Sequence, residues 1–289
     1  MFKRISIYGL GLLGGSLCLK LRTISPGTRI IAYGRNYARM KPALAKEKVD
    51  EIGIIDESSP EGADLIVVSV PVLASVPIIN KILADPRLSP QTLVIDVGSV
   101  KGRIVQEAVR TPGAAQFVGC HPMAGSEKSG YEYGSESLYD NSTVIITPHP
   151  GNKREDVGII SNFWKQIGAR TVEVNPGFHD EILAKTSHLP HMAACVLVDM
   201  VRRLSETMTA SMSIDFFIGN GFRDVTRIAA GSVDMWMEIA EMNRDMLCAV
   251  FDKLADSMSD LKHMISSLPD DKEQLREYLR MIGDYRRKL

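Results

Sequence analysis

The glycine-rich turn at residues 9–14, Gly-Leu-Gly-Leu-Leu-Gly, constrains the fold of this chain more than any other feature. It directly follows the apolar run Ile5–Tyr8, which we predict to be a strand, and directly precedes an apolar helical pattern. In this setting the first glycine permits a tight turn, the second lets a pyrophosphate approach the backbone, and the third lets the helix pack closely on the strand. The free N–H groups of the helix N-terminus favour an anion. We therefore expect a dinucleotide to contact Gly9, Gly11, Leu12, Leu13 and Gly14; the alternative is a glycine-rich turn without a ligand.

The second predicted strand bears on the choice of cofactor. NAD sites carry an Asp or Glu about 20 residues after the glycines, where it binds the ribose 2′-hydroxyl. Here the strand Arg29–Tyr33 runs into Gly34-Arg35-Asn36, which contains no carboxylate. Arg35 can pair with a 2′-phosphate, so the sequence favours NADP over NAD. The alternative is that Arg35 is an ordinary exposed loop residue.

Short β-branched runs alternate with helical patterns in the first part of the chain, which is typical of a doubly wound parallel sheet. Val70 and Pro71 end one of these runs at the carboxyl edge of the sheet, where we expect them to line the cofactor cleft; a plain strand-ending proline is the alternative. The predicted strands are Ile5–Tyr8, Arg29–Tyr33, Leu65–Val70, Leu93–Val97, Ala115–Gly119, Thr143–Thr147 and Thr171–Val174. Helical patterns between them include Gly14–Arg22, Ala38–Glu47 and Lys101–Val109.

The pattern changes after Val174, where Asn175-Pro176-Gly177 interrupts it. Strand signals are absent from Phe178 onward, and long amphipathic helical segments carry most of the 14 methionines. Flexible Met side chains are typical of helix–helix contacts. We therefore predict a Rossmann-type α/β domain at residues 1–174 and an all-α domain at residues 175–289 that forms a homodimer through its helices.

Composition excludes several classes of function. The formal net charge of −1 over 289 residues gives no reason to expect binding to nucleic acid or to an anionic membrane. No apolar stretch approaches membrane-spanning length, and the first residues lack the layout of a signal peptide. The four cysteines are scattered without a CxxC motif, which predicts buried free thiols in a reducing compartment. We therefore expect a cytoplasmic protein.

Three further segments carry residues suited to chemistry. The first is Asp96-Val97-Gly98-Ser99-Val100-Lys101-Gly102, after a buried strand, and the second is Gly119-Cys120-His121-Pro122-Met123-Ala124-Gly125-Ser126-Glu127, after the next. The third joins Thr186-Ser187-His188-Leu189-Pro190-His191 with residues 221–229, Gly-Phe-Arg-Asp-Val-Thr-Arg-Ile-Ala. Together with the glycine motif, these segments resemble the prephenate and arogenate dehydrogenases of tyrosine biosynthesis. The resemblance covers nearly the whole chain in the right order.

The resemblance implies an oxidative decarboxylation. Hydride leaves the alcohol-bearing ring carbon of prephenate or arogenate for the nicotinamide of NADP or NAD, a base takes the hydroxyl proton, and carbon dioxide departs as the ring becomes aromatic. His121 matches the family's catalytic base, and a neutral imidazole can accept a proton near pH 7. Ser99 matches the serine that orients this imidazole by a hydrogen bond. The resemblance leaves the choice between prephenate and arogenate open.

The remaining site residues follow from the same match. Arg227 matches the arginine that binds a substrate carboxylate, for which a guanidinium is well suited. His191 matches a substrate-binding histidine. Glu127 and Asp224 match acidic residues near the mouth of the site, and Ser126 lies beside Glu127 in the same segment.

Each of these assignments has an alternative. His188 and His191 could ligate a metal, but no partner set completes such a site, so we predict no metal. Arg223 and Arg227 could form a solvated face. We expect His149, His179 and His263 to be core or surface residues without special partners. For the whole chain, the alternatives are another two-domain hydroxyacid or imine dehydrogenase and a non-catalytic protein that senses NADP.

Overall fold

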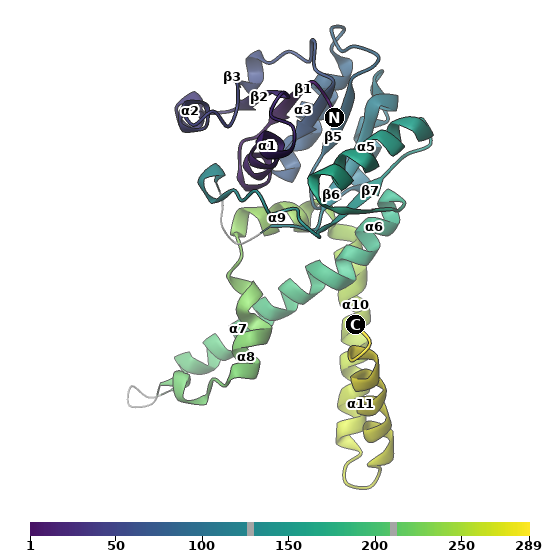
Figure 1. Cartoon of the computed structure of the whole chain (residues 1–289). Helices are drawn as coiled ribbons and strands as arrows, with labels where there is room; N and C mark the ends of the chain where they lie inside the picture. Colours follow the sequence, from purple (N-terminus) through teal and green to yellow (C-terminus); the bar gives the residue numbers. More distant parts are fainter. Residues whose placement is uncertain (126–129, 209–212) are drawn as a thin grey trace. The chain divides into compact units, whose positions relative to one another are not determined.

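The computed structural model describes residues 1–125, 130–208 and 213–289. Ser126 and Glu127 lie outside the described residues. By the density of its internal contacts, the chain divides into the units Met1–Arg244 and Asp245–Leu289. The first unit contains one eight-stranded sheet in the order β3-β2-β1-β4-β5-β6-β7-β8 (Figure 1).

The sheet is parallel except where β6 pairs antiparallel with β7. Its strands are β1 Arg4–Tyr8, β2 Arg29–Gly34, β3 Glu51–Ile54, β4 Leu65–Val68, β5 Leu93–Asp96, β6 Phe117–Pro122, β7 Thr143–Thr147 and β8 Arg170–Glu173. The chain order reverses between β1 and β4, so the carboxyl ends of these two strands flank the crevice at which doubly wound sheets bind ligands. The predicted α/β fold class is therefore confirmed.

Two predicted strands differ from the observed ones by more than one residue at an end, and one strand was not predicted. The strand predicted at Ala115–Gly119 runs from Phe117 to Pro122, which places His121 inside a strand instead of after it. The strand predicted at Leu65–Val70 ends at Val68, so Val70 and Pro71 lie in the connection to the next helix. Strand β3 was not predicted because it lies at the sheet edge, is only partly buried and begins with a charged residue.

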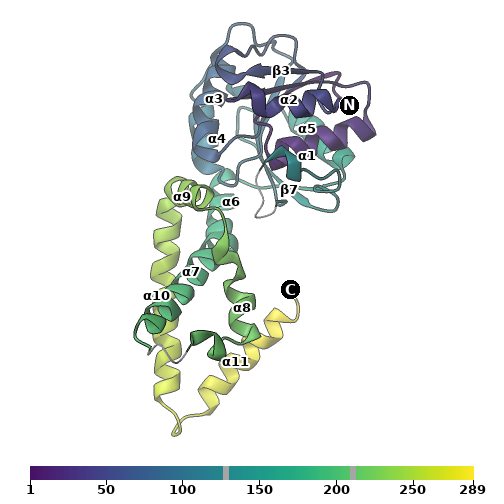
Figure 2. The same ribbon diagram turned by 90° about the vertical axis from the view of Figure 1, so that its left-hand side faces the viewer.

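Helices cover both faces of the sheet (Figure 2). They are α1 Leu12–Ile24, α2 Tyr37–Ala45, α3 Val72–Ala84, α4 Gly102–Ala108 and α5 Arg154–Ile167. One apolar cluster packs residues of α1 and α5 on one face, and a second packs residues of α3 and α4 on the other. Strands β4 and β5 are fully buried between them, which explains their continuous apolar sequences.

The rest of the described chain is helical, as predicted. In the first unit, α6 Pro176–Leu183 continues through a π-helical turn, Ala184–His188, into α7 Leu189–Glu206. Helix α8 Asn220–Thr226, the 3₁₀ turn Arg227–Ala230 and α9 Val233–Met242 follow. Helix α10 Arg244–Ser266 and α11 Glu273–Arg286 supply nearly all of the second unit.

The cysteine prediction is partly wrong. All four thiols are free, and burial raises the pKa of Cys18 and Cys120 to about 12. Cys195 is only half-buried and Cys248 is exposed in the single chain. Both of these residues lie in the helical part, where large apolar side chains also remain exposed. The sequence pattern does not distinguish burial in a core from burial against another chain.

Candidate active site

The glycine turn has the geometry that a pyrophosphate requires. Gly9 has a φ of 100°, and a Cβ on it would lie 2.3 Å from the carbonyl oxygen of Ser69. A Cβ on Gly14 would lie 2.2 Å from the carbonyl oxygen of Gly9, so both positions exclude side chains. A Cβ on Gly11 would meet nothing within 4 Å, which leaves the backbone open at the start of α1. These residues therefore fit a dinucleotide, whose phosphates the first-turn N–H groups of α1 would bind.

Two other predicted cofactor contacts adjoin this turn. The Val70 side chain would lie 2.9 Å from a Cβ on Gly9, so it packs directly against the turn, and Pro71 precedes the first turn of α3. Arg35 is exposed between β2 and α2 and makes no hydrogen bond or ion pair with the described residues. Next to it, Asn36 caps α2 by accepting a hydrogen bond from the Arg39 backbone.

A buried ion pair holds the strand that carries His121. The side chains of Asp96 and Lys101 are fully buried and form an ion pair between the end of β5 and the start of α4. Lys101 Nζ also donates to the Cys120 carbonyl at 2.9 Å, and Asp96 Oδ1 accepts from the Cys120 backbone N–H at 3.2 Å. Both backbone groups of the residue before His121 are thereby held, so the position of His121 is set by charged groups on the neighbouring connection.

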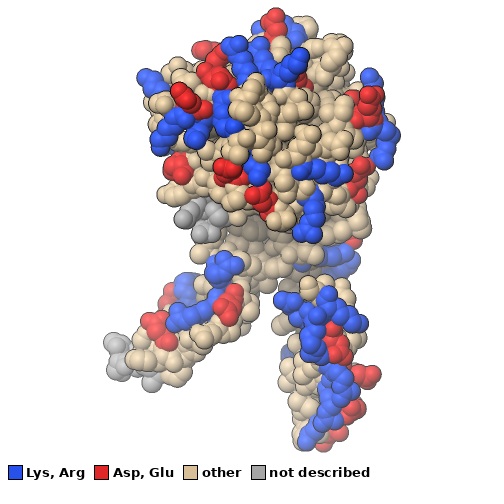
Figure 3. Space-filling model, viewed as in Figure 1, with Lys and Arg blue, Asp and Glu red and all other residues tan. Residues whose placement is uncertain are grey.

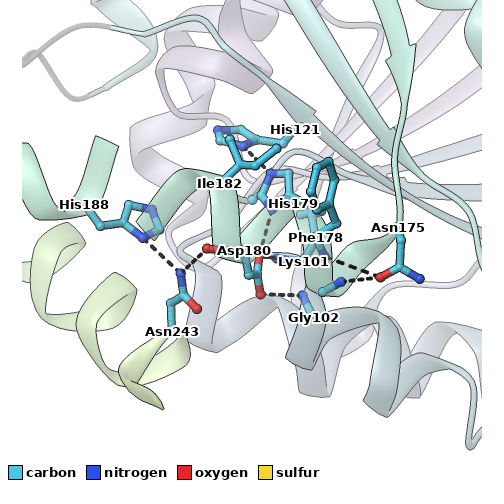
Figure 4. A network of polar contacts seen from close by, with 12 residues as sticks. Lys101, Gly102, His121, Asn175, Phe178, His179, Asp180, Ile182, His188 and Asn243 are labelled. Atoms are coloured by element: carbon cyan, nitrogen blue, oxygen red, sulfur yellow. Dashed lines mark hydrogen bonds and ion pairs between the residues drawn. The ribbon is translucent and has the colours of Figure 1, made fainter. Parts of the chain in front are cut away.

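His121 contacts a second buried histidine on α6. Its Nδ1 lies 2.9 Å from Nε2 of His179, and Nδ1 of His179 lies 2.7 Å from Oδ1 of Asp180 (Figure 4). The expectation that His179 has no special partner is therefore wrong. The error has a physical reason: His121 and His179 are 58 residues apart in sequence, and no local pattern pairs them.

Asp180 connects the sheet to the helical part. Its carboxylate accepts from the backbone N–H groups of Lys101 and Gly102 at 2.8 and 2.7 Å, where α4 begins. Its carbonyl accepts a hydrogen bond of 2.9 Å from the Asn243 side-chain amide, whose nitrogen also lies 3.1 Å from Nδ1 of His188. An amide nitrogen can only donate, so Nδ1 of His188 is the acceptor.

His191 lies at the start of α7, stacked on an indole ring. Its ring and that of Trp236 are 3.6 Å apart with an interplanar angle of 12°. Nδ1 of His191 is buried and has no hydrogen-bond partner among the described residues. A buried polar atom without a partner costs free energy, so it marks a position where a ligand could bind.

Arg227 and Asp224 lie near His191 in the helical part. Helix α7 packs against α8, which carries Asp224, and against the 3₁₀ turn that begins at Arg227. Both side chains are exposed, as is Arg223. The structure therefore brings His191 beside the turn that begins at Arg227, whereas the predicted roles of Ser126 and Glu127 fall outside the described residues.

Ser99 follows β5 at the same sheet edge as His121 and is half-buried. Within the described ranges, its side chain makes no hydrogen bond to His121, whose ring nitrogen Nδ1 faces His179 instead. Sequence reasoning gave no role to Asp96 or Lys101 and considered His188 only as a possible metal ligand. The available signal was a Lys five residues after an Asp that ends a continuously apolar run, because charged residues near a core are almost always paired.

The electrostatics favour the neutral forms of His121, His188 and His191. Burial lowers the pKa of His121 well below its ordinary value, and His179, Lys101 and His188 lower it further. Burial also lowers the pKa of His188 to about 4, although Asp180 opposes this shift. For His191 burial lowers the pKa, and the neighbouring backbone of Ile228 opposes it. At neutral pH His121 is thus an uncharged imidazole that can accept a proton.

The described part of the chain contains no group of three or more His, Cys, Asp or Glu side chains able to hold a metal. None of the described helices is both long and apolar enough to cross a membrane. On the face drawn in Figure 3, Lys and Arg side chains are interspersed with Asp and Glu.

Two family models match the chain. Residues 17–173 match the nucleotide-binding domain of prephenate dehydrogenase, and residues 175–281 match its dimerization domain. A prephenate dehydrogenase from Bacillus subtilis is 33% identical over 98% of this chain and 75% of the relative. A cyclohexadienyl dehydrogenase from Zymomonas mobilis is 30% identical over 94% of this chain and 91% of the relative.

A solved structure agrees with these matches. The crystal structure of prephenate dehydrogenase from A. aeolicus, in complex with hydroxyphenyl propionate and NAD+, has a TM-score of 0.90 and 30% identity. The alignment covers 100% of this chain and 98% of that chain. The predicted resemblance is confirmed: the chain belongs to the prephenate dehydrogenase family.

Proposed function

We propose that this protein catalyses the oxidative decarboxylation of prephenate or arogenate in tyrosine biosynthesis, with hydride transfer to a nicotinamide cofactor. The observation that carries the proposal is a neutral, buried His121 at the sheet edge that also bears the glycine turn. Family membership supplies the reaction class, and the products are 4-hydroxyphenylpyruvate from prephenate or tyrosine from arogenate.

His121 is the proposed base. It accepts the proton of the ring hydroxyl while the cofactor, when bound, accepts the hydride from the same carbon. Loss of carbon dioxide then leaves an aromatic ring, which makes the reaction strongly favourable. Burial keeps His121 uncharged, so it is ready to accept the proton at neutral pH. Ser99, on the adjacent connection, is the proposed partner that orients the imidazole or the substrate hydroxyl.

The helical part supplies the proposed substrate contacts. The unpartnered Nδ1 of His191 is a hydrogen-bonding group awaiting the substrate, and Arg227 binds one of its carboxylates. Asp224, with Ser126 and Glu127, lies at the entrance in this proposal. A carboxylate near the substrate side chain would favour the amine of arogenate over the keto group of prephenate.

NADP is the proposed cofactor, with NAD as the alternative. Arg35 follows β2 where NAD sites carry an acidic residue, and its exposed guanidinium is free to pair with a 2′-phosphate. The related A. aeolicus structure contains NAD+, so the two relatives differ in cofactor if the proposal holds. The proposed contacts to the rest of the cofactor are Gly9, Gly11, Leu12, Leu13, Gly14, Val70 and Pro71.

The proposed organisation is a cytoplasmic homodimer with a nucleotide-binding domain at residues 1–174 and a helical domain at residues 175–289. The two family models support this boundary because one ends at residue 173 and the other begins at residue 175. The second is described as a dimerization domain, which supports pairing through the helices.

One assay tests the reaction, the substrate and the cofactor together. Purified protein is incubated with prephenate or arogenate and with NAD or NADP in four combinations, and reduced nicotinamide is followed by its absorbance. We expect reduction with NADP and at least one substrate, and a loss of kcat on the order of a hundredfold or more in His121→Asn with cofactor binding retained. If no combination yields reduced nicotinamide although cofactor binding is confirmed, the proposal is rejected.

The role of Arg35 is tested separately. Replacing Arg35 with Ala removes the proposed partner of the 2′-phosphate, so we expect KM for NADP to rise about tenfold or more while KM for NAD changes little. Arg110→Ala is a matched control, because Arg110 is an exposed arginine paired with Glu107. Equal effects of Arg35→Ala on both cofactors would count against a phosphate contact.

A further inference from the structure

The carboxylate of Asp180 reaches His121 through one intervening imidazole. Asp180 Oδ1 is 2.7 Å from Nδ1 of His179, and Nε2 of His179 is 2.9 Å from Nδ1 of His121 (Figure 4). We propose that His179 and Asp180 are positioning residues that fix the tautomer of His121, so that its Nε2 presents the lone pair that accepts the substrate proton. This inference rests on the proposed function, because it assigns the direction in which the proposed base acts.

The donors and acceptors in this series of hydrogen bonds can be assigned starting from Asp180. Two backbone N–H groups at the start of α4 donate to its carboxylate, Lys101 to Oδ1 and Gly102 to Oδ2. Both oxygens are therefore held as acceptors, since a backbone N–H can only donate. The remaining contact on Oδ1 is with a ring nitrogen, so Nδ1 of His179 must carry the proton.

The tautomer of His121 follows from that of His179. In its uncharged form, His179 with a proton on Nδ1 has its lone pair on Nε2. It can accept a hydrogen bond only from an N–H on Nδ1 of His121, which leaves the lone pair of His121 on Nε2. Within the described part of the chain, no group hydrogen-bonds to this Nε2, so it is available to the substrate hydroxyl.

The same series of hydrogen bonds accommodates the positive charge that forms on His121 during the reaction. When Nε2 of His121 accepts the hydroxyl proton, the resulting imidazolium keeps its Nδ1–H bond to His179, and the negative charge of Asp180 lies behind it. Among the described residues, Lys101 and His188 are the other titratable groups that lower the pKa of His121. Neither side chain can supply a negative charge, since Lys101 is the cation of the pair with Asp96 and His188 accepts a hydrogen bond from Asn243. Asp180 is thus placed to offset the transient positive charge.

The tautomer can be observed without turnover. Nitrogen-15 NMR of protein labelled at its six histidines, with His121 assigned from the His121→Asn spectrum, distinguishes protonated from unprotonated ring nitrogens. We expect a protonated Nδ1 and an unprotonated Nε2 on His121 at pH 8. An Nε2–H on His121 would overturn the proposal. Failure of the proposed function gives a different result: the spectrum is as expected, but none of the four substrate and cofactor combinations yields reduced nicotinamide.

Variants of His179 test the effect on catalysis. His179→Phe keeps a ring in the cavity but removes the acceptor, so we expect kcat to fall on the order of a hundredfold with KM changed less than about threefold. His179→Gln restores an acceptor for Nδ1–H of His121, and we expect it to recover at least about tenfold of the lost kcat. A space-filling role would instead favour Phe over Gln.

His149→Phe is the matched control, because His149 is a half-buried histidine bonded to the Ala114 backbone outside the site. We expect its kcat to equal that of the wild type. A His179→Phe variant with unchanged kcat would reject the proposal. If that variant fails to fold, the wild-type nitrogen-15 spectrum decides the question by itself.

Discussion

The residue type allowed at some positions of this protein depends on how closely other atoms approach, as much as on the chemistry of the side chain. Gly102 is an example, because a Cβ there would lie 2.7 Å from Oδ2 of Asp180, which accepts a hydrogen bond from the Gly102 backbone. The sequence showed a glycine at the start of a helix, where glycine is ordinary. Only the approach of Asp180, 78 residues away, gives this glycine a specific role.

Replacing Gly102 with Ala should therefore be costly despite the higher helix propensity of Ala. The new methyl group displaces the Asp180 carboxylate, so we expect the free energy of unfolding to fall by about 1–3 kcal/mol and kcat to fall as well. Urea denaturation and the dehydrogenase assay measure the two effects.

Gly158→Ala provides the contrast, because Gly158 is an exposed position inside α5 where a Cβ would meet nothing within 4 Å. We expect the free energy of unfolding of this variant to rise by about 0.5–1 kcal/mol, because Ala has a higher helix propensity than Gly. A Gly102→Ala variant that behaved like Gly158→Ala would show that Asp180 moves aside at no cost.

Among the elements, the junction from α6 through the π-helical turn into α7 carries the most chemistry. It contributes His179 and Asp180 from α6, His188 from the π-helical turn and His191 from the start of α7. The sequence predicted helix here and selected His191. It did not reveal that one continuous helical segment directs His179 and His188 into a buried polar network and stacks His191 on Trp236, because side-chain direction depends on the π-helical turn and on packing against the sheet.

This junction should make stability sensitive to acid. His188 has a pKa of about 4 in the folded chain and close to 6.5 when unfolded, so the unfolded state binds the proton first. The contribution of neutral His188 to the free energy of unfolding is fully present above pH 6.5. It is lost as pH falls toward 4, and the loss is on the order of 3 kcal/mol. The lowered pKa of His121 adds a loss of the same sign.

His188→Asn tests this account, because Asn offers an acceptor to Asn243 without titrating. We expect the free energy of unfolding, measured by urea denaturation from pH 7 to pH 4.5, to fall less steeply with acid than in the wild type. His263→Asn is the control, since His263 lies near the end of α10 and is exposed. Parallel pH dependence in wild type and His188→Asn would contradict the assignment.

At the scale of the whole molecule, the helical part exposes large apolar side chains in the single chain. Phe216 is 83% exposed, Phe217 66% and Met200 63%, values that are unfavourable for large apolar side chains in a single chain. The match of residues 175–281 to a dimerization domain supports the proposal that a second copy of the chain covers this surface. The methionine-rich pattern of the sequence predicted such a surface, although not which residues form it.

Charged substitutions on this surface should weaken the proposed dimer. We expect the double variant Met200→Glu and Phe216→Glu to shift the mass measured by light scattering from two chains toward one, because burying a carboxylate opposes association. Ile159→Glu, at a 40% exposed position on α5 outside the helical part, should leave the mass unchanged. A dimeric mass for the double variant at low micromolar concentration would place the interface elsewhere.

The sequence by itself determined the features that depend on neighbours along the chain. The glycine turn, the alternation of strands and helices and the change to helix after Val174 are local patterns, and the structure confirms them because backbone conformation follows such patterns. Three contacts became visible only in the folded chain: His179 meets His121, Asp180 caps α4, and buried Lys101 holds the strand that carries His121. These contacts join residues distant in sequence, and their energies arise from burial and charge pairing, which exist only once the sheet and the helices have packed together.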